Sequence, residues 1–298
     1  MLDFNRIRTI SISQRKNKVG LSDLIKPEDS KELIESEDLA ELAQKVVDSY
    51  KSERQVMLSM GAHVIKVGMS LLVIELMKKG ILKHIALNGA GPIHDFELAH
   101  YGKTSEYVEE TIEDGSFGMI DETGKILNDA INEGAKNNYG MGYSIGKKIS
   151  DMKAQHKEYS ILYNAYKLNV PITVHVAIGT DIIHQHPNCD GASLGKTTYQ
   201  DFKIMAESVS KLEGGVIINA GSAVVLPEVF IKALTIARNL GHKVEDITAA
   251  NLDMINHYRP RENVVTRPTS LGGKGYIIIE RHEKTIPTLH RKILNALR

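Results

Sequence analysis

Two short apolar segments with a helix between them constrain the fold more than any other feature of the chain. Gln55 to Met60 and Ile85 to Leu87 have the length and composition of buried strands, and Met69 to Lys79 is a strongly apolar helical stretch. Each strand breaks into a glycine turn, at Gly61 and at Asn88 to Gly91. A strand–helix–strand unit of this kind implies two parallel strands joined by a right-handed crossover.

Strands and helices continue to alternate along the chain. Further strands are predicted over residues 172–178, 215–219, 244–249 and 276–279, and helices over 38–50, 120–136, 159–168, 198–212, 227–240 and 285–297. The alternation predicts an α/β fold, with a Rossmann-like, mostly parallel sheet and helices on both faces. Residues 1–54 are expected to form an N-terminal arm and helix, and residues 55–298 a single domain. The glycine-rich segment 140–146 has no strand before it, so we expect a bend before a helix there.

Composition and charge exclude several classes of protein. With 42% hydrophobic and 25% charged residues, the chain can bury a large core. Lys plus Arg and Asp plus Glu both number 37, so no net field favours nucleic acid or an anionic membrane. A single cysteine, Cys189, excludes an internal disulfide framework, and the longest apolar runs are far too short for a membrane span. No basic-then-apolar leader opens the chain, so a cytoplasmic enzyme is expected.

The glycine turns at Gly61 and Asn88 to Gly91 mark the predicted ligand-binding edge. Parallel sheets bind ligands outside the carboxyl ends of their strands, where free backbone N–H groups and a helix dipole favour an anion. His94 and Asp95 follow the second turn. A histidine at a helix N-terminus tends to stay neutral, which suits a proton acceptor in the oxidation of an amine or alcohol. The competing interpretation is that Asp95 merely complements the helix dipole.

A polar segment over residues 179–195 follows the predicted strand 172–178 and is a typical place for a functional loop. It contains His184 and His186, which would face the same way in an extended segment. Together with His63, His94 or Asp95 from neighbouring turns, they could hold a metal ion. The alternative is that both histidines hydrogen-bond within the loop.

Two lysines and the cysteine are further candidates. Lys66 and Lys274 could act as nucleophiles if desolvated, or could hold a phosphate or carboxylate. The glycines that flank Lys274 favour close approach to a ligand. Cys189 has no certain basic neighbour and is expected to be a bystander.

Five short segments occur in the order and spacing of the deoxyhypusine synthase family. They are Gly61 to Gly68, Asn88 to Gly91, Thr180-Asp181, Ile218 to Ser222 and Arg259 to Glu262. From about residue 55 to the end, the chain resembles that family. The resemblance implies a Rossmann-like fold, NAD bound near subunit interfaces, and a homotetramer. It also implies oxidation of a polyamine and transfer of its aminobutyl group to a lysine or to a second polyamine.

The resemblance implies two sets of site residues. The cofactor-binding set comprises Ala62, His63, Asn88, Gly89, Ala90, Asp181, Ala220, Gly221, Ser222, Thr248 and Ala249. Glu262 matches an acidic residue of the polyamine pocket, and His186 is added as a second substrate contact.

Several positions depart from the family pattern. Where the family has its catalytic lysine, this chain reads Thr266-Arg267-Pro268, and neither proline nor a permanently charged arginine can form an imine. Lys274 is the nearest replacement. Leu226 stands in place of a histidine. Arg281 or His282 replaces an aspartate near the cofactor ribose, which leaves the choice between NAD and NADP open.

The sequence therefore predicts an NAD(P)-dependent enzyme that oxidises a small amine, polyamine or amino acid. Transfer of an aminoalkyl group is implied only by the family resemblance. His94 or His184 would take the proton, and Asp95, Asp181 or Glu262 would hold the cationic substrate. We expect no nucleic-acid or membrane partner. Two alternatives stay open: a metal-dependent hydrolase or lyase built on His184 and His186, and a nucleotide-binding regulator without turnover.

Overall fold

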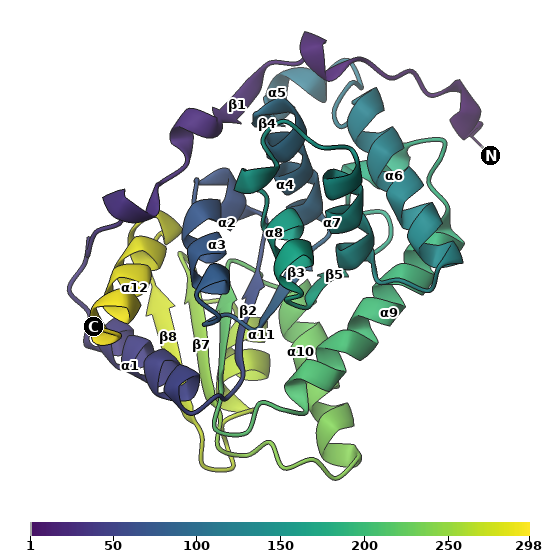
Figure 1. Cartoon of the computed structure of the whole chain (residues 1–298). Coiled ribbons are helices and arrows are strands. Elements are labelled where there is room, and N and C mark those ends of the chain that lie inside the picture. Colours follow the sequence, from purple (N-terminus) through teal and green to yellow (C-terminus); the bar gives the residue numbers. More distant parts are fainter. Residues whose placement is uncertain (1) are drawn as a thin grey trace.

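A six-stranded parallel sheet forms the centre of the molecule (Figure 1). The structure is a computed structural model that describes residues 2–298. The strands are β2 (Val56–Met60), β3 (His84–Asn88), β5 (Ile172–His175), β6 (Val216–Ala220), β7 (Thr248–Asp253) and β8 (Lys274–Ile279). They lie in the order β5-β3-β2-β6-β7-β8, and every neighbouring pair is parallel. The direction of winding reverses between β2 and β6, which makes that gap the topological switch point.

Both faces of the sheet are covered by helices, which explains why its strands are apolar without alternation. On β2, Leu58 and Met60 join one core cluster and Met57 joins another. The first cluster packs under α1 (Glu37–Lys51), α3 (Ser70–Lys78), α4 (Ala90–Tyr101), α6 (Asp121–Lys136), α7 (Met141–Asp151), α8 (Ile161–Leu168) and α12 (His282–Ala296). The second packs under α9 (Gly191–Val209) and α10 (Val225–Asn239). The predicted α/β architecture is confirmed.

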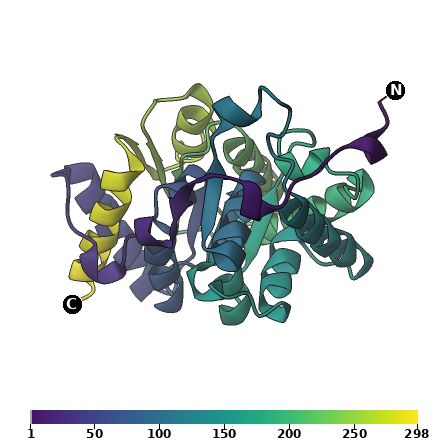
Figure 2. The same ribbon diagram turned by 90° about the horizontal axis from the view of Figure 1, so that it is seen from above.

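The N-terminal segment runs across one end of the molecule (Figures 1 and 2). Its strand β1 (Asn17–Gly20) pairs antiparallel with β4 (Lys103–Glu106) in a separate two-stranded sheet. Further along, Ile25 donates a backbone hydrogen bond to the carbonyl of Gly68, and α1 packs against α12. The segment is therefore tied to the turn that follows β2 and to the last helix of the chain.

Short helices complete the fold. They are α2 (His63–Lys66), α5 (Val108–Thr111) and α11 (Tyr258–Pro260), followed by a π-helical turn over Arg261–Thr266. No helix within residues 2–298 has both the length and the apolar character needed to cross a membrane.

Several elements differ from the sequence-based expectation: β1 and β4 were not predicted, and β5 ends at His175 rather than at 178. Helix α9 begins at Gly191 rather than at 198, because the Asp190 carboxylate caps its first backbone N–H groups and shortens the expected loop. Strand β7 covers 248–253 rather than 244–249. The glycine-rich segment 140–146 is no bend before a helix but the start of α7 itself. A Cβ on Gly142 would lie 2.2 Å from the Ile172 carbonyl oxygen, so the glycine permits close packing on β5.

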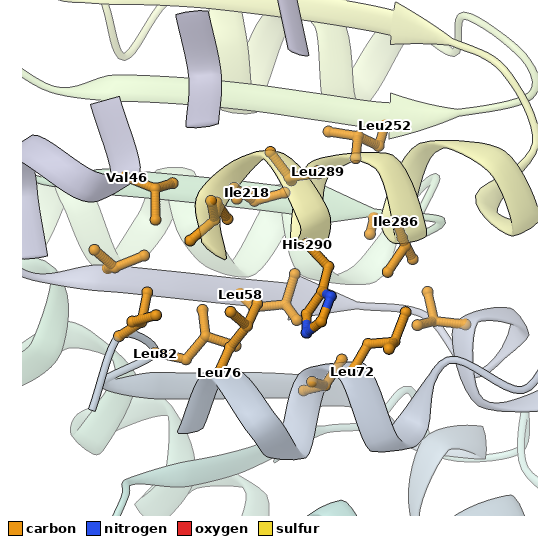
Figure 3. A pocket seen from close by; sticks show the side chains of 16 residues that line it. Val46, Leu58, Leu72, Leu76, Leu82, Ile218, Leu252, Ile286, Leu289 and His290 are labelled. Carbon is orange, nitrogen blue, oxygen red and sulfur yellow. The ribbon is translucent and has the colours of Figure 1, made fainter. Parts of the chain in front are cut away.

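A small cavity of about 40 Å³ lies in the core between α1, α3, α12 and the sheet (Figure 3). Apart from His290, its walls are aliphatic side chains, among them Val46, Leu58 and Leu289. The His290 ring nitrogens are bonded to Ser30 at 3.0 Å and to Glu75 at 2.8 Å. An apolar cavity of this size stays dry, so it represents missing packing rather than a ligand site.

Candidate active site at the carboxyl ends of the strands

The turns after β2 and β6 touch each other at the switch point. The Gly61 N–H donates to the Ala220 carbonyl at 2.9 Å, and a Cβ on Gly61 would lie 2.2 Å from the Gly221 carbonyl oxygen. Gly221 has a φ of +69°, a left-handed conformation that favours glycine. The predicted residues Ala62, His63, Ala220, Gly221 and Ser222 therefore lie together at the point where such sheets bind ligands.

A histidine and a carboxylate that the sequence did not identify as catalytic join this turn. His282 opens α12, and its Nε2 would lie 2.5 Å from a Cβ on Gly221. Its ring centroid is 5.9 Å from that of His63. Burial lowers the pKa of His282, while the nearby Asp253 carboxylate raises it and His63 lowers it further. Asp253 was not predicted as a site residue, because β7 was expected to end four residues before it.

A buried asparagine pair supports the turn after β6. The Asn219 Nδ2 donates to the Asn251 Oδ1 at 2.8 Å and to the Ser222 carbonyl at 3.0 Å. Asn219 Oδ1 and Asn251 Nδ2 are buried with no partner among the residues that the structure describes. The pair thus links β6 to β7 and holds the Ser222 carbonyl in place. Its other two polar atoms have no hydrogen-bond partner beneath the turn.

On the other side of the switch point, Asp181 lies against the start of α4. A Cβ on Gly89 would lie 1.9 Å from the Asp181 Oδ2, so only glycine leaves room for this carboxylate. Burial raises the pKa of Asp181 to about 6, and its Oδ2 has no hydrogen-bond partner within residues 2–298. Asn88 Oδ1 accepts from the Gly91 N–H at 3.2 Å. Of the predicted turn residues Asn88, Gly89 and Ala90, Gly89 thus lies directly against the buried carboxylate of Asp181.

His184 lies beside Asp181 with a defined tautomer. Its Nδ1 accepts from the backbone N–H groups of Gly179 and Asp181, at 3.1 and 3.2 Å, so the neutral ring carries its proton on Nε2. Burial lowers the pKa of His184, which favours that neutral form. Nε2 is 3.8 Å from the Asp181 Oδ2 and has no partner in the described chain. One unused donor and one unused acceptor thus lie side by side.

His94 is a neutral histidine held by a hydroxyl group. Its Nδ1 is 2.8 Å from the Thr104 Oγ1. Burial lowers the pKa of His94 to about 4, and the neighbouring charge of Lys66 lowers it as well, although Glu97 opposes them. The expected neutrality therefore arises chiefly from desolvation rather than from a helix dipole.

Asp95 faces away from His94, because adjacent helical residues point in different directions. Its carboxylate accepts from the backbone N–H groups of Ile161 and Leu162, at 2.7 and 3.1 Å, and from the Ser160 hydroxyl. It thus caps α8. This placement corrects the expectation that Asp95 acts beside His94.

His186 does not join His184. Its Nε2 is 2.9 Å from the Gly118 carbonyl oxygen, and its ring packs on Gly124. The segment is a 3-10 turn rather than extended, so residues two apart do not face the same way. Within residues 2–298, no three His, Cys, Asp or Glu side chains are arranged to hold a metal ion. The two histidines therefore do not form the shared site on which the metal-dependent alternative depends.

Thr248, Ala249 and Lys274 lie at the amino ends of their strands, on the side of the sheet opposite to these turns. They begin β7 and β8, and Thr248 is in register with Lys274 and with Val216, the first residue of β6. Lys274 Nζ is 3.7 Å from the Glu41 carboxylate. The structure does not bring these three residues to the site, because the ends of β7 and β8 that face it are Asp253 and Ile279.

Glu262 and Cys189 also stand apart from the turns. Glu262 lies in the π-helical turn and pairs with Arg261 at 2.9 Å. Cys189 is half-buried, and burial raises the pKa of its thiol, which disfavours the reactive thiolate.

Similarity to solved structures concerns the fold. No protein-family model and no curated protein sequence matches the chain. Its structure is similar to a LOR/SDH protein from Methanococcus maripaludis S2, with TM-score 0.54, 15% identity, and coverage of 91% of this chain and 74% of that one. It is also similar to a proposed deoxyhypusine synthase from Entamoeba histolytica, with TM-score 0.51, 12% identity, and coverage of 87% and 90%.

A third similar structure is AgrE in complex with ornithine and NAD+, with TM-score 0.53 and 12% identity. The match covers 88% of this chain and 34% of AgrE, so the chain spans about a third of that protein's length. The predicted deoxyhypusine-synthase-like fold is therefore supported by solved structures.

Proposed function

We propose that this protein is a nicotinamide-dinucleotide-dependent enzyme that acts on a small amine or amino acid. The observation that carries the proposal is the pair of unpartnered atoms, Asp181 Oδ2 and His184 Nε2, which lie 3.8 Å apart at the Gly89 turn after β3. The presence of ornithine and NAD+ in AgrE, part of which has a similar fold, supports these two classes of ligand.

The residues at the edge fit a dinucleotide. Asp181 Oδ2 offers an acceptor and His184 Nε2–H offers a donor, 3.8 Å apart, which suits the vicinal hydroxyls of a ribose. Gly61 lets the turn after β2 pack on Gly221, and Gly89 leaves room for the Asp181 carboxylate, so the turns stay compact at the carboxyl ends of the strands, where sheets of this kind bind dinucleotides. Asn88, Ala90 and Ser222 belong to the same turns.

The side chains provide the remaining chemistry. A bound nicotinamide ring would supply the hydride acceptor. The neutral His94 accepts the proton that the substrate nitrogen loses as its neighbouring carbon gives up hydride. Asp253, close to His282, offers a carboxylate to a cationic substrate. Because the chain has no lysine at the family's catalytic position, the proposed reaction is oxidation without aminoalkyl transfer.

Calorimetric titration of the folded protein with NAD and with NADP tests the cofactor. We expect one of them to bind. Asp181→Asn replaces one acceptor oxygen of the carboxylate by an NH₂ donor, so it should weaken that binding at least tenfold. Asp190→Asn is the matched control, because Asp190 caps α9 on the exposed surface. Absence of heat with both dinucleotides on folded protein would sink the proposal.

Turnover is measured separately, as reduction of the bound dinucleotide in the presence of basic amino acids and polyamines. Reduction with any of them supports the enzyme. Binding without reduction across the panel would contradict catalysis and leave a nucleotide-binding regulator.

A further inference from the structure

A chain of buried hydrogen bonds leads from His94 to the N-terminal segment. His94 Nδ1 is 2.8 Å from Thr104 Oγ1, and Thr104 Oγ1 is 2.6 Å from Glu97 Oε2. The same Glu97 oxygen accepts from Arg15 Nη2 at 2.7 Å, while Oε1 accepts from Thr123 at 2.9 Å. Four separate parts of the chain thus meet at one carboxylate.

The direction of each proton in this chain follows from the chemistry of its members. An arginine can only donate, so Glu97 is the acceptor of the Arg15 hydrogen bond. A carboxylate can only accept, so the Thr104 hydroxyl hydrogen points to Glu97. The Thr104 oxygen can then only accept from His94, which requires the hydrogen on Nδ1. The lone pair of the neutral His94 ring is therefore on Nε2.

The ion pair at the end of the chain is deeply buried. The side chains of Arg15 and Glu97 are 3% and 1% exposed. Burying such a pair is expensive in free energy unless its hydrogen bonds are complete. Arg15 also donates to Asn17 Oδ1 through Nε and Nη2, and its Nη1 is 3.9 Å from Glu106 on β4. The completed hydrogen bonds fix the position of Glu97 and, through the Thr104 hydroxyl, that of the His94 ring.

We propose that Arg15, Glu97 and Thr104 are positioning residues that hold His94 in the Nδ1–H tautomer, so that Nε2 is its proton-accepting atom. The importance of this for catalysis rests on the proposed function, but the tautomer itself does not. The charged groups around His94 are Glu97 on its own helix, Lys66 on α2 and Arg15 on the N-terminal segment. The N-terminal segment would then be part of the working site rather than a mere packing arm.

Nitrogen NMR of the ¹⁵N-histidine-labelled full chain tests the proposal without any substrate. The His94 signals are assigned by their loss in His94→Gln. We expect a protonated Nδ1 and an unprotonated Nε2 at neutral pH. In Thr104→Val, which removes the acceptor with little change in shape, the ring should become a mixture of both tautomers. Thr104→Ser keeps the hydroxyl and should retain the wild-type signals.

Thr235→Val is the control, because its hydroxyl on α10 bonds only to the Ile231 carbonyl on an exposed face. A wild-type ring with its proton on Nε2 would overturn the proposal, and so would an unchanged tautomer in folded Thr104→Val. If Thr104→Val does not fold, the wild-type and Thr104→Ser spectra decide.

An activity measurement separates this inference from the proposed function. Once a substrate that reduces the dinucleotide is known, Thr104→Val should lower kcat in proportion to the share of His94 rings that leave the Nδ1–H tautomer, about twofold for an even mixture, with little change in KM. Thr104→Ser should restore most of kcat. If His94 has the Nδ1–H tautomer but no dinucleotide binds, the positioning role is supported and the proposed function is refuted. If the dinucleotide is reduced but His94 has the Nε2–H tautomer, the proposed function is supported and the positioning role is refuted.

Discussion

At the scale of single residues, burial rather than charge sets the protonation of the titratable side chains inside this sheet. His84 on β3 and His175 on β5 are almost wholly inaccessible, and burial lowers the pKa of each to about 3. Both bond to the Thr173 hydroxyl at 3.0 Å, and His84 also bonds to Ser208 at 2.8 Å. The two rings are neutral and fully committed to the core.

These two histidines should make the fold sensitive to acid. Their folded pKa lies below the unfolded value of about 6.5, so their stability contribution is complete above pH 6.5 and is lost as pH falls toward 3. Each contributes a slope of up to about 1.4 kcal/mol per pH unit. Urea unfolding at pH 4.5 and pH 7 should therefore show a smaller pH difference for His84→Gln than for wild type.

Asp201 opposes this trend, since burial raises the pKa of its carboxyl to about 7 and the folded state then gains stability on acidification. Comparing variants cancels that contribution. His242→Gln, on the exposed surface, should keep the wild-type pH difference. An equal pH difference in His84→Gln would contradict the prediction.

Asp95 should affect stability and not chemistry. Asp95→Ala leaves the capped N–H groups of Ile161 and Leu162 and the Ser160 hydroxyl without a partner in a buried place. A loss of about 1–3 kcal/mol in the free energy of unfolding is expected. Dinucleotide affinity should be unchanged below the unfolding transition. Asp190→Ala, which removes an exposed cap, should lose about 1 kcal/mol. A stable but inactive Asp95→Ala enzyme would restore Asp95 to the catalytic set.

At the scale of secondary-structure elements, the buried strands β2 and β3 were predicted well, whereas β7 was misplaced and elements defined by distant partners were missed. The buried strands β2 and β3 differ from their predicted ranges by one residue at each affected end. Strands β1 and β4 are polar, and they pair with each other across more than 80 residues, so local periodicity contains no sign of them. The same reasoning applies to the site. The glycine turns are visible in the sequence, but His282 and Asp253 meet only because β7 and β8 end side by side.

A substitution that adds one methyl group tests the contact between the turns after β2 and β6. Gly61→Ala would place Cβ 2.2 Å from the Gly221 carbonyl oxygen and must separate the two turns. We expect a loss of about 1–3 kcal/mol in unfolding free energy and, on the proposed function, at least a tenfold weaker dinucleotide affinity. Gly191→Ala begins α9 with nothing within 4 Å, so it should be neutral or slightly stabilising. Equal effects of both substitutions would refute the close approach.

At the scale of the whole molecule, the core is continuous but incompletely filled. The cavity between α1, α3 and α12 can accept an added methylene from Val46, whose side chain lines it (Figure 3). Val46→Ile should raise the free energy of unfolding by about 0.5–1 kcal/mol, measured by urea denaturation. Val108→Ile, on an exposed residue of α5, should have no measurable effect. A destabilised Val46→Ile would mean that the cavity walls cannot accommodate the extra atoms.

The packing of α1 on α12 has a consequence for how the chain folds. Ser30 Oγ bonds to the Pro287 carbonyl across 257 residues, and α1 buries its apolar face, including Leu39 and Leu42, against the same part of the molecule. Contacts so far apart in sequence form late and slow folding. During synthesis, α1 leaves the ribosome long before α12 and cannot find this partner until α12 has emerged. A nascent chain therefore exposes the apolar face of α1 until α12 has been made.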